Sequence, residues 1–147
     1  MAINPEYAGR TFEPSGPYEV SRGKIAEFAT AIGDSSPLCR DRAAAQAAGY
    51  PDVIAPPTFA VVVLAGGSAK LMADPGLGAN YAMVVHGEQS FTHSRPLHAG
   101  DVVVAQSTIE SIKQIRSMTT MATATEIRTV DGEHVCTARS ILVERGG

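Results

Sequence analysis

Residues 57–72 read PTFAVVVLAGGSAKLM, and this stretch decides the fold. It is apolar on nearly every face of a helix and carries one charge, Lys70. A helix that is hydrophobic all round is expected to be buried. Valines 61–63 would also fit a strand, but the length and the prolines before it favour a helix. Pro57 suits its first turn. Gly66-Gly67 cost roughly 1 kcal/mol each in helix propensity, which favours close packing there.

Two shorter helices are predicted upstream. Ser21 is a good N-cap residue, and Gly33 ends the apolar pattern that follows it. The apolar positions have i, i+3, i+4, i+7 spacing: Ile25, Phe28, Ala29 and Ile32. Residues 41–48 predict an alanine-rich helix capped by its first residue, an aspartate. Residues 1–17 are rich in proline and glycine and predict a surface arm, with a short strand at 18–20.

Downstream, the sequence changes to four segments rich in Val, Ile and Thr. They are residues 80–92, 101–115, 117–130 and 133–144. The third segment alternates, with Met121, Thr123, Thr125 and Ile127 on one face. Asp131-Gly132 is a strong signal for a two-residue hairpin. Helices followed by antiparallel strands predict one α+β domain over residues 1–147, with a sheet of about five strands wrapped around the long helix. The pattern alone also fits another α+β sandwich.

The composition excludes several classes of function. The 147 residues are 44% hydrophobic and carry a net charge of −3, which does not suit binding to a nucleic-acid backbone. No apolar run is long enough to cross a bilayer, and the N-terminus does not resemble a signal peptide. Cys39 and Cys136 form no CxxC or metal-ligand pattern. We therefore expect reduced thiols in a cytoplasmic protein without a metal.

Three blocks resemble one known family. GDSSPLC at 33–39 resembles the loop Gly-Asp-x-Asn-Pro-aliphatic-His of (R)-specific enoyl hydratases. APPTF at 55–59 resembles the lead into the central helix of MaoC-like dehydratase N-domains, and HGEQSFTHSRPLHAGD at 86–101 is similar to their next block. The blocks follow the family order over nearly the whole chain. The chain looks closest to small actinobacterial relatives of the hydroxyacyl-carrier-protein dehydratase subunits. The resemblance implies the hot-dog fold, a curved antiparallel sheet around a long helix.

The resemblance also implies a reaction, the hydration of an enoyl thioester or its reverse. In the family, an Asp and a His hold the same water, and a backbone N–H at the start of the central helix meets the thioester oxygen. Here Asp34 matches the family Asp, while Cys39 stands in place of the His and Ser36 in place of the Asn. A thiol, with a reference pKa of about 8.5, is a poor base unless strongly perturbed. The implied dyad is therefore incomplete. No cofactor is implied beyond the coenzyme A or acyl carrier protein that carries the thioester.

Each candidate residue also has an ordinary structural explanation. Asp34 is either a catalytic residue or the cap of its own turn. His86 is either a substitute base or a satisfied histidine of a central strand, with Asp34 as a possible bonding partner. Cys39, Thr58 and Phe59 are candidate substrate-binding residues. For the first two, a buried thiol and a hydroxyl that bonds backbone at the helix start are the favoured explanations.

Three functions fit this combination. The first is an (R)-3-hydroxyacyl-thioester dehydratase or enoyl hydratase of fatty-acid metabolism, acting on acyl-CoA or acyl-ACP. The second is a non-catalytic subunit that pairs with a dyad-bearing hot-dog chain and shapes the acyl-chain site. The third is an acyl-thioester binding module or a thioesterase. In each case an open sheet edge predicts a homodimer or a heterodimer.

Overall fold

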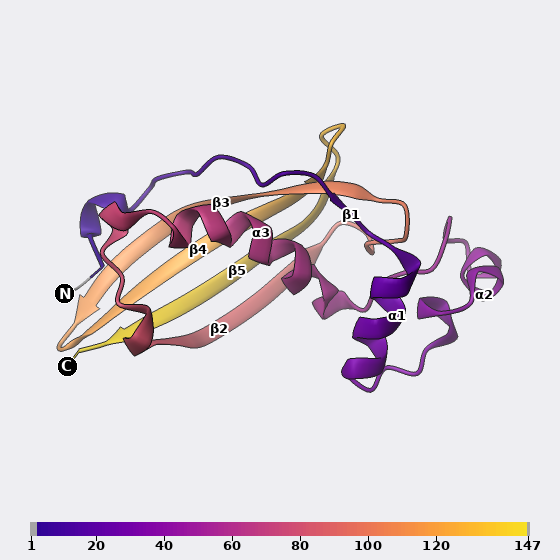
Figure 1. Ribbon diagram of the computed structural model, residues 1–147, viewed down its shortest axis with the longest axis horizontal. Helices are drawn as coiled ribbons and strands as arrows, with labels where there is room; N and C mark the ends of the chain where they lie inside the picture. Colours follow the sequence, from indigo (N-terminus) through magenta and orange to yellow (C-terminus); the bar gives the residue numbers. More distant parts are fainter. Residues whose placement is uncertain (1–2, 147) are drawn as a thin grey trace.

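The computed structural model describes residues 3–146, which form a five-stranded antiparallel sheet with a helix along it (Figure 1). The strands are β1 (Tyr18–Glu19), β2 (Val84–His93), β3 (Val102–Ile115), β4 (Met118–Thr129) and β5 (His134–Arg145). The helices are α1 (Arg22–Ala31), α2 (Arg42–Ala47) and α3 (Ala60–Met72). The strand order is β1-β3-β4-β5-β2. This arrangement confirms the predicted α+β, hot-dog fold.

The predicted helix starts are confirmed by their capping bonds. The Ser21 hydroxyl accepts a hydrogen bond from the Lys24 N–H at 3.1 Å. The Asp41 carboxylate accepts one from the Ala43 N–H at 2.9 Å. These side chains satisfy N–H groups that have no acceptor within the helix. The long apolar stretch is helical as predicted, but it begins with a separate 3-10 turn over Pro57–Phe59.

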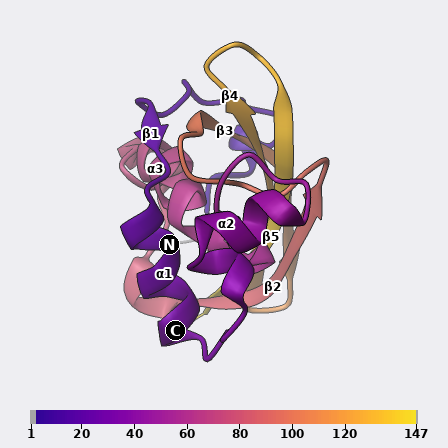
Figure 2. The ribbon, with the colours of Figure 1, turned by 90° about the vertical axis from the view of Figure 1, so that its right-hand side faces the viewer.

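Helix α3 packs on one face of the sheet, mainly against β3, while α1 and α2 lie beyond one end of the sheet (Figure 2). Gly67 marks a close approach between helix and sheet. A Cβ atom at this position would lie 2.9 Å from the Ala105 Cβ and 3.2 Å from the Thr125 Cγ2. The prediction of close packing is therefore confirmed for Gly67. A Cβ at Gly66 would meet only Ser15, at 3.5 Å.

The alternation predicted for the third strand segment is confirmed on β4, where the four predicted inner positions are buried. The hairpin at Asp131-Gly132 also forms, but its loop is one residue longer than predicted. The Thr129 N–H donates to the Glu133 carbonyl at 2.9 Å, which leaves a three-residue loop. Gly132 has a φ of 97°, whereas Asp131 is not left-handed. A two-residue type I′ turn would need a positive φ at both residues.

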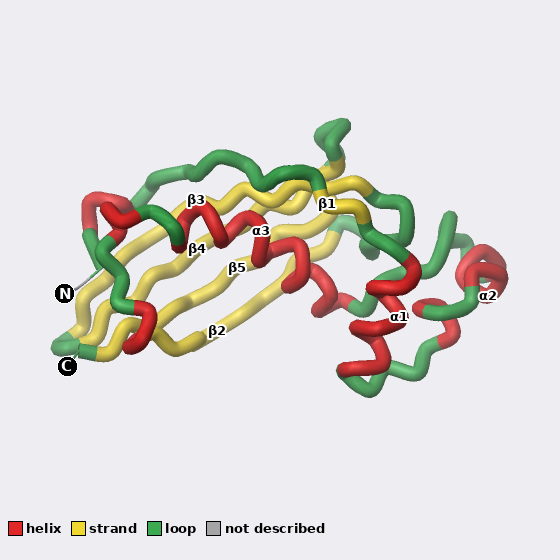
Figure 3. The backbone as a smooth tube through the Cα atoms, viewed as in Figure 1, coloured by secondary structure: helices red, strands yellow, loops and turns green. Residues whose placement is uncertain are grey.

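Most of the described residues 3–17 are exposed, as predicted for a surface arm, but the arm is bound to the sheet. This segment runs along β3 (Figure 3). Backbone N–H groups of Gly9, Phe12 and Ser15 donate to the carbonyls of Ile109, Ser107 and Ala105 at 2.7, 2.9 and 2.7 Å. Ile3 and Tyr7 are buried in a second core cluster. The arm thus covers the outer edge of β3, because its apolar side chains reach that cluster.

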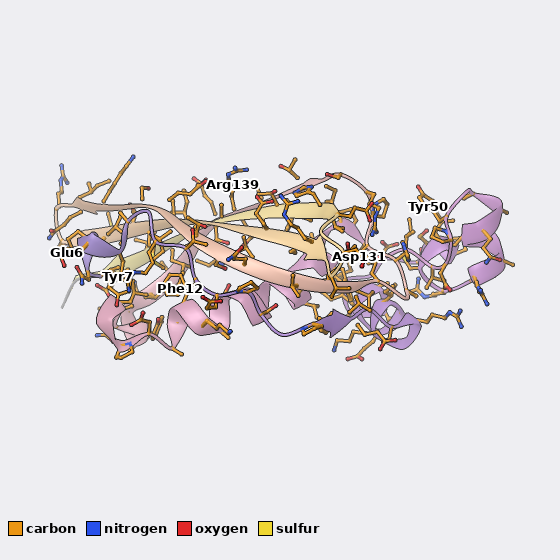
Figure 4. The ribbon with its side chains drawn as sticks, turned by 90° about the horizontal axis from the view of Figure 1, so that it is seen from above. Glu6, Tyr7, Phe12, Tyr50, Asp131 and Arg139 are labelled. Carbon is orange, nitrogen blue, oxygen red and sulfur yellow. The ribbon has the colours of Figure 1, made fainter. Side chains whose placement is uncertain are left out.

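The two faces and the two edges of the sheet differ. Arg139 points away from the face that carries α3 (Figure 4) and pairs with Glu110 on that outer face, at 3.6 Å. Among the described residues, β2 pairs with β5 alone, so its second edge is open.

No helix in the described part of the chain is long and apolar enough to span a membrane.

Candidate functional site

The loop after α1 carries the first candidate, Asp34. Gly33 adopts a φ of 74°, and the chain then enters a 3-10 turn over Pro37–Cys39. The Asp34 carboxylate accepts a hydrogen bond from the Ser36 N–H at 2.9 Å. The Ser36 hydroxyl in turn accepts one from the Leu38 N–H at 3.3 Å. Asp34 therefore caps its own turn, which is the structural role considered for it.

Cys39 lies in the main core, with 3% of its surface exposed. Burial raises the pKa of the Cys39 thiol, and the negative charge of nearby Asp34 raises it further. A buried thiol with a raised pKa is protonated near neutral pH and is a poor base. The residue in the position of the family His is thus close to Asp34 but is a poor base.

Two further candidates, Thr58 and Phe59, lie at the start of the central helix and differ in their exposure. Thr58 is exposed, and it is the second residue of the 3-10 turn. The first N–H groups of a helix have no acceptor within it, so this end is suited to an anionic oxygen. Phe59, by contrast, is fully buried and packs edge-on against Phe28, with 5.4 Å between ring centroids. The structure therefore assigns Phe59 to the core and leaves Thr58 accessible.

His93 also contacts this helix start, a contact that the sequence did not predict. Its Nε2 lies 2.9 Å from the Pro57 carbonyl oxygen, and its Nδ1 is buried without a hydrogen-bond partner in the described chain. The Cys136 Sγ atom lies 3.9 Å from the His93 Nε2 atom. Burial raises the pKa of the Cys136 thiol to about 11. The distance in sequence between Pro57 and His93 explains why no local pattern indicated the contact.

His86 is not brought to the Asp34 loop. Its Nε2 contacts the Glu88 carbonyl at 2.9 Å, and its side chain lines a cavity under the far half of α3. The structure thus shows neither the expected bond between Asp34 and His86 nor a pocket that they share.

That cavity has a volume of about 370 Å³ and lies between α3 and the sheet. It is lined by Leu64, Ser68, Leu71, Met72, Tyr81, Val84, His86, Ser107, Met121, Thr123, Ser140 and Leu142. Its inner walls are buried, while Met72, Tyr81 and His86 are exposed and mark the mouth, beside β2. None of the lining residues comes from the segment 33–59. This apolar cavity therefore opens away from Asp34.

The strongest ionic contacts have structural roles. Arg95 bonds Asp101 at 2.9 Å and Glu133 at 3.0 Å, which ties the β2–β3 loop to the β4–β5 hairpin and lowers the pKa of Glu133. Asp52 bonds Arg22 at 2.8 Å, and this bond lowers the Asp52 pKa to about 2. Residues 3–146 contain no group of three or more His, Cys, Asp or Glu side chains arranged to hold a metal.

The fold and the order of the motifs agree with those of known proteins. A family model described as "FAS1-like, dehydratase domain region" matches residues 6–138. The chain belongs to this dehydratase-region family. A relative, a UPF0336 protein of Thermobifida fusca, is 51% identical over 146 residues, which are 99% of this chain and 96% of the relative.

Solved structures agree with the family assignment. A MaoC-like dehydratase superimposes with a TM-score of 0.86 and 26% identity over 96% of this chain, which spans only 43% of that longer chain. A chain of the HadBC (3R-hydroxyacyl-ACP dehydratase) complex of Mycobacterium tuberculosis superimposes with a TM-score of 0.81 and 25% identity. That match covers 93% of this chain and 96% of the other. These comparisons confirm the hot-dog fold and the relationship to MaoC-like dehydratases.

Proposed function

We propose that this protein is the non-catalytic subunit of a heterodimeric (3R)-hydroxyacyl-thioester dehydratase. In this role it binds the acyl chain, while a second hot-dog chain supplies an intact Asp/His dyad. The observation that carries the proposal is the direction in which the cavity opens. Its mouth lies beside β2, and no residue of the Asp34–Phe59 segment lines it.

An acyl chain bound in this cavity cannot reach Asp34 of the same protein through the interior of the fold. Gly67 closes the gap between α3 and the sheet, and buried Phe59, Val63 and Ala105 fill the core beyond it. The thioester head of a bound acyl chain would then emerge at the mouth. Groups that react with it must come from a partner placed against β2.

The two sheet edges favour a partner at β2. The arm covers the edge of β3, while β2 offers ten residues with one unpaired edge and exposes 40% of Val85. Unpaired strand edges favour pairing with another chain. The HadBC dehydratase is itself a complex of hot-dog subunits, which supports such a pairing here.

The cavity size suggests an acyl chain of medium length. The helix segment from Leu64 to Met72 covers about 12 Å at about 1.5 Å per residue. With carbon–carbon bonds of about 1.5 Å, a zigzag chain of roughly ten carbons spans this distance.

The chemistry then divides between the two chains. Dehydration removes a proton from the α-carbon and expels the 3-hydroxyl as water, which needs a base and an acid at the same site. The partner's dyad performs these transfers. This chain fixes the acyl tail and keeps water from it, and fixed geometry lowers the barrier.

The test is reconstitution. The purified chain alone should not hydrate crotonyl-CoA or 2-decenoyl thioesters, and hydration should appear when a hot-dog partner with the intact Gly-Asp-x-Asn-Pro-x-His loop is added. The partner's Asp→Asn variant should abolish it. Turnover by the isolated chain that Asp34→Asn abolishes would instead establish an independent enzyme. Thioester hydrolysis without hydration would favour the thioesterase.

A further inference from the structure

The strand β2 contains an irregularity beside the cavity. His86 pairs with Leu142, and Glu88 pairs with the next residue, Ile141, so Gly87 is an extra residue in the strand. Such a bulge reverses which residues face each side of a sheet. A Cβ atom at Gly87 would lie 3.2 Å from the Ile141 carbonyl oxygen, which explains why glycine occupies the bulge.

The bulge turns His86 toward the cavity. Beyond it, the partly buried residues of β2 are Gln89, Phe91 and His93, all at odd positions. Before it, Val84 and His86 line the cavity, both at even positions. Without the extra residue, His86 would face the opposite side of the sheet. The bulge therefore places an imidazole at the mouth of a mainly apolar cavity.

The hydrogen bond of His86 fixes the role of its second nitrogen. Nε2 lies 2.9 Å from the Glu88 carbonyl, which can only accept, so Nε2 carries the proton. In the neutral ring Nδ1 is then a hydrogen-bond acceptor. Within residues 3–146, the hydrogen bond of the His86 side chain is the one that Nε2 makes, and Nδ1 makes none.

Of the other five polar side chains that line the cavity, all but Thr123 already have hydrogen-bond partners. Ser107 bonds Thr125 at 2.7 Å, Ser140 donates to Gln89 at 2.7 Å, and Ser68 donates to the Leu64 carbonyl at 3.0 Å. The Tyr81 hydroxyl at the mouth donates to the Met72 carbonyl at 2.8 Å. His86 therefore supplies an uncommitted acceptor where the carbons closest to the thioester would lie.

We infer that His86 is a specificity-determining residue that accepts a hydrogen bond from the 3-hydroxyl of the bound acyl chain. This inference rests on the proposed function, because it takes the cavity as the acyl site. A site that bonds a substrate hydroxyl discriminates against the analogue without it, since the analogue leaves that group unpaired. The cavity thus favours a 3-hydroxyacyl thioester over a saturated one.

Calorimetric binding to the full chain tests this with two probes, (3R)-hydroxydecanoyl-pantetheine and decanoyl-pantetheine. A neutral hydrogen bond should give the hydroxylated probe a preference of roughly 3- to 10-fold. His86→Phe keeps the ring size without nitrogens and should reduce the preference to one. His86→Asn keeps an acceptor near the Nδ1 position and should restore part of it. His98→Asn is the control, since His98 lines no part of the cavity, and should leave the preference unchanged.

The outcomes separate this inference from the proposed function. Equal affinity of the wild-type chain for both probes, or an unchanged preference in a folded His86→Phe chain, would overturn the role of His86 and leave the acyl cavity standing. If neither probe binds the wild-type chain, both proposals are overturned. Thermal unfolding of each variant shows whether a loss of binding reflects a loss of fold.

Discussion

At the scale of single residues, Cys39 decides how the family resemblance is interpreted. The sequence places a thiol where relatives of the hydratase type carry a histidine, and the structure places that thiol in the same core cluster as Ala55 and Phe59. Its surroundings are those of a packed apolar side chain. Asp34 nearby caps a turn. The two residues at the dyad positions, Asp34 and Cys39, thus have structural roles: one caps a turn and the other packs in the core.

Cys39→Ala should therefore affect stability and spare catalysis. Loss of the buried sulfur should lower the free energy of unfolding by roughly 1–2 kcal/mol, as a small cavity replaces it. Urea denaturation measures this loss. The activity of the reconstituted pair should stay within about twofold of wild type, a factor worth less than 1 kcal/mol. A drop of a hundredfold with an intact fold would show that the thiol takes part in the reaction.

At the scale of elements, the fit of α3 against the sheet depends on one of two adjacent glycines. Gly67 faces Ala105 and Thr125 at distances that leave no room for a methyl group, whereas Gly66 faces the arm with ordinary clearance. Helix propensity alone would favour alanine at both positions by roughly 1 kcal/mol. Tertiary packing opposes that preference at Gly67 only.

The two alanine variants should consequently differ in sign. Gly67→Ala forces α3 away from β3 and should destabilise the chain by roughly 1–3 kcal/mol. Gly66→Ala should be neutral or stabilise it by up to about 1 kcal/mol. Urea denaturation of both variants under the same conditions gives the comparison. Equal effects would mean that the close contact at Gly67 does not limit the packing.

The elements that the sequence predicts correctly are those with local signals. Ser21 and Asp41 cap the helices that they were expected to cap, and β4 alternates as expected. The features that it does not predict depend on contacts between distant segments. Pairing with β5 creates the bulge at Gly87. The arm lies on the surface as expected, but its backbone bonds to β3 join segments about 90 residues apart and have no local signal.

The candidate site divides in the same way. Motif order identifies the loop of Asp34 and Cys39 and the helix start at Thr58, which are local in sequence. It does not reveal that His86 lines the cavity under α3, away from the Asp34 loop. The bulge at Gly87 reverses which side of the sheet the His86 side chain faces. Nor does it reveal the contact of His93 with the Pro57 carbonyl, which joins two segments only in the folded chain.

At the scale of the whole molecule, the open edge of β2 should govern association. Val85→Lys introduces a charge on that edge, and edge lysines oppose strand pairing. We expect the variant to weaken assembly with the partner at least tenfold, measured by sedimentation or by titration of activity. Ile115→Lys is the matched control, an exposed residue on β3 near the β3–β4 hairpin. Equal weakening by both variants would indicate that a different surface carries the association.

The arm along β3 has a consequence for the size of the assembly. A sheet with two adhesive edges can recruit a neighbour on each side, and each recruit offers a new free edge, so growth continues as a filament. In this molecule the chain's own residues 9–19 occupy one of the two edges. If the proposed partner pairs at β2 and the irregular arm accepts no further strand, growth stops after a single addition. The proposed assembly then contains two sheets.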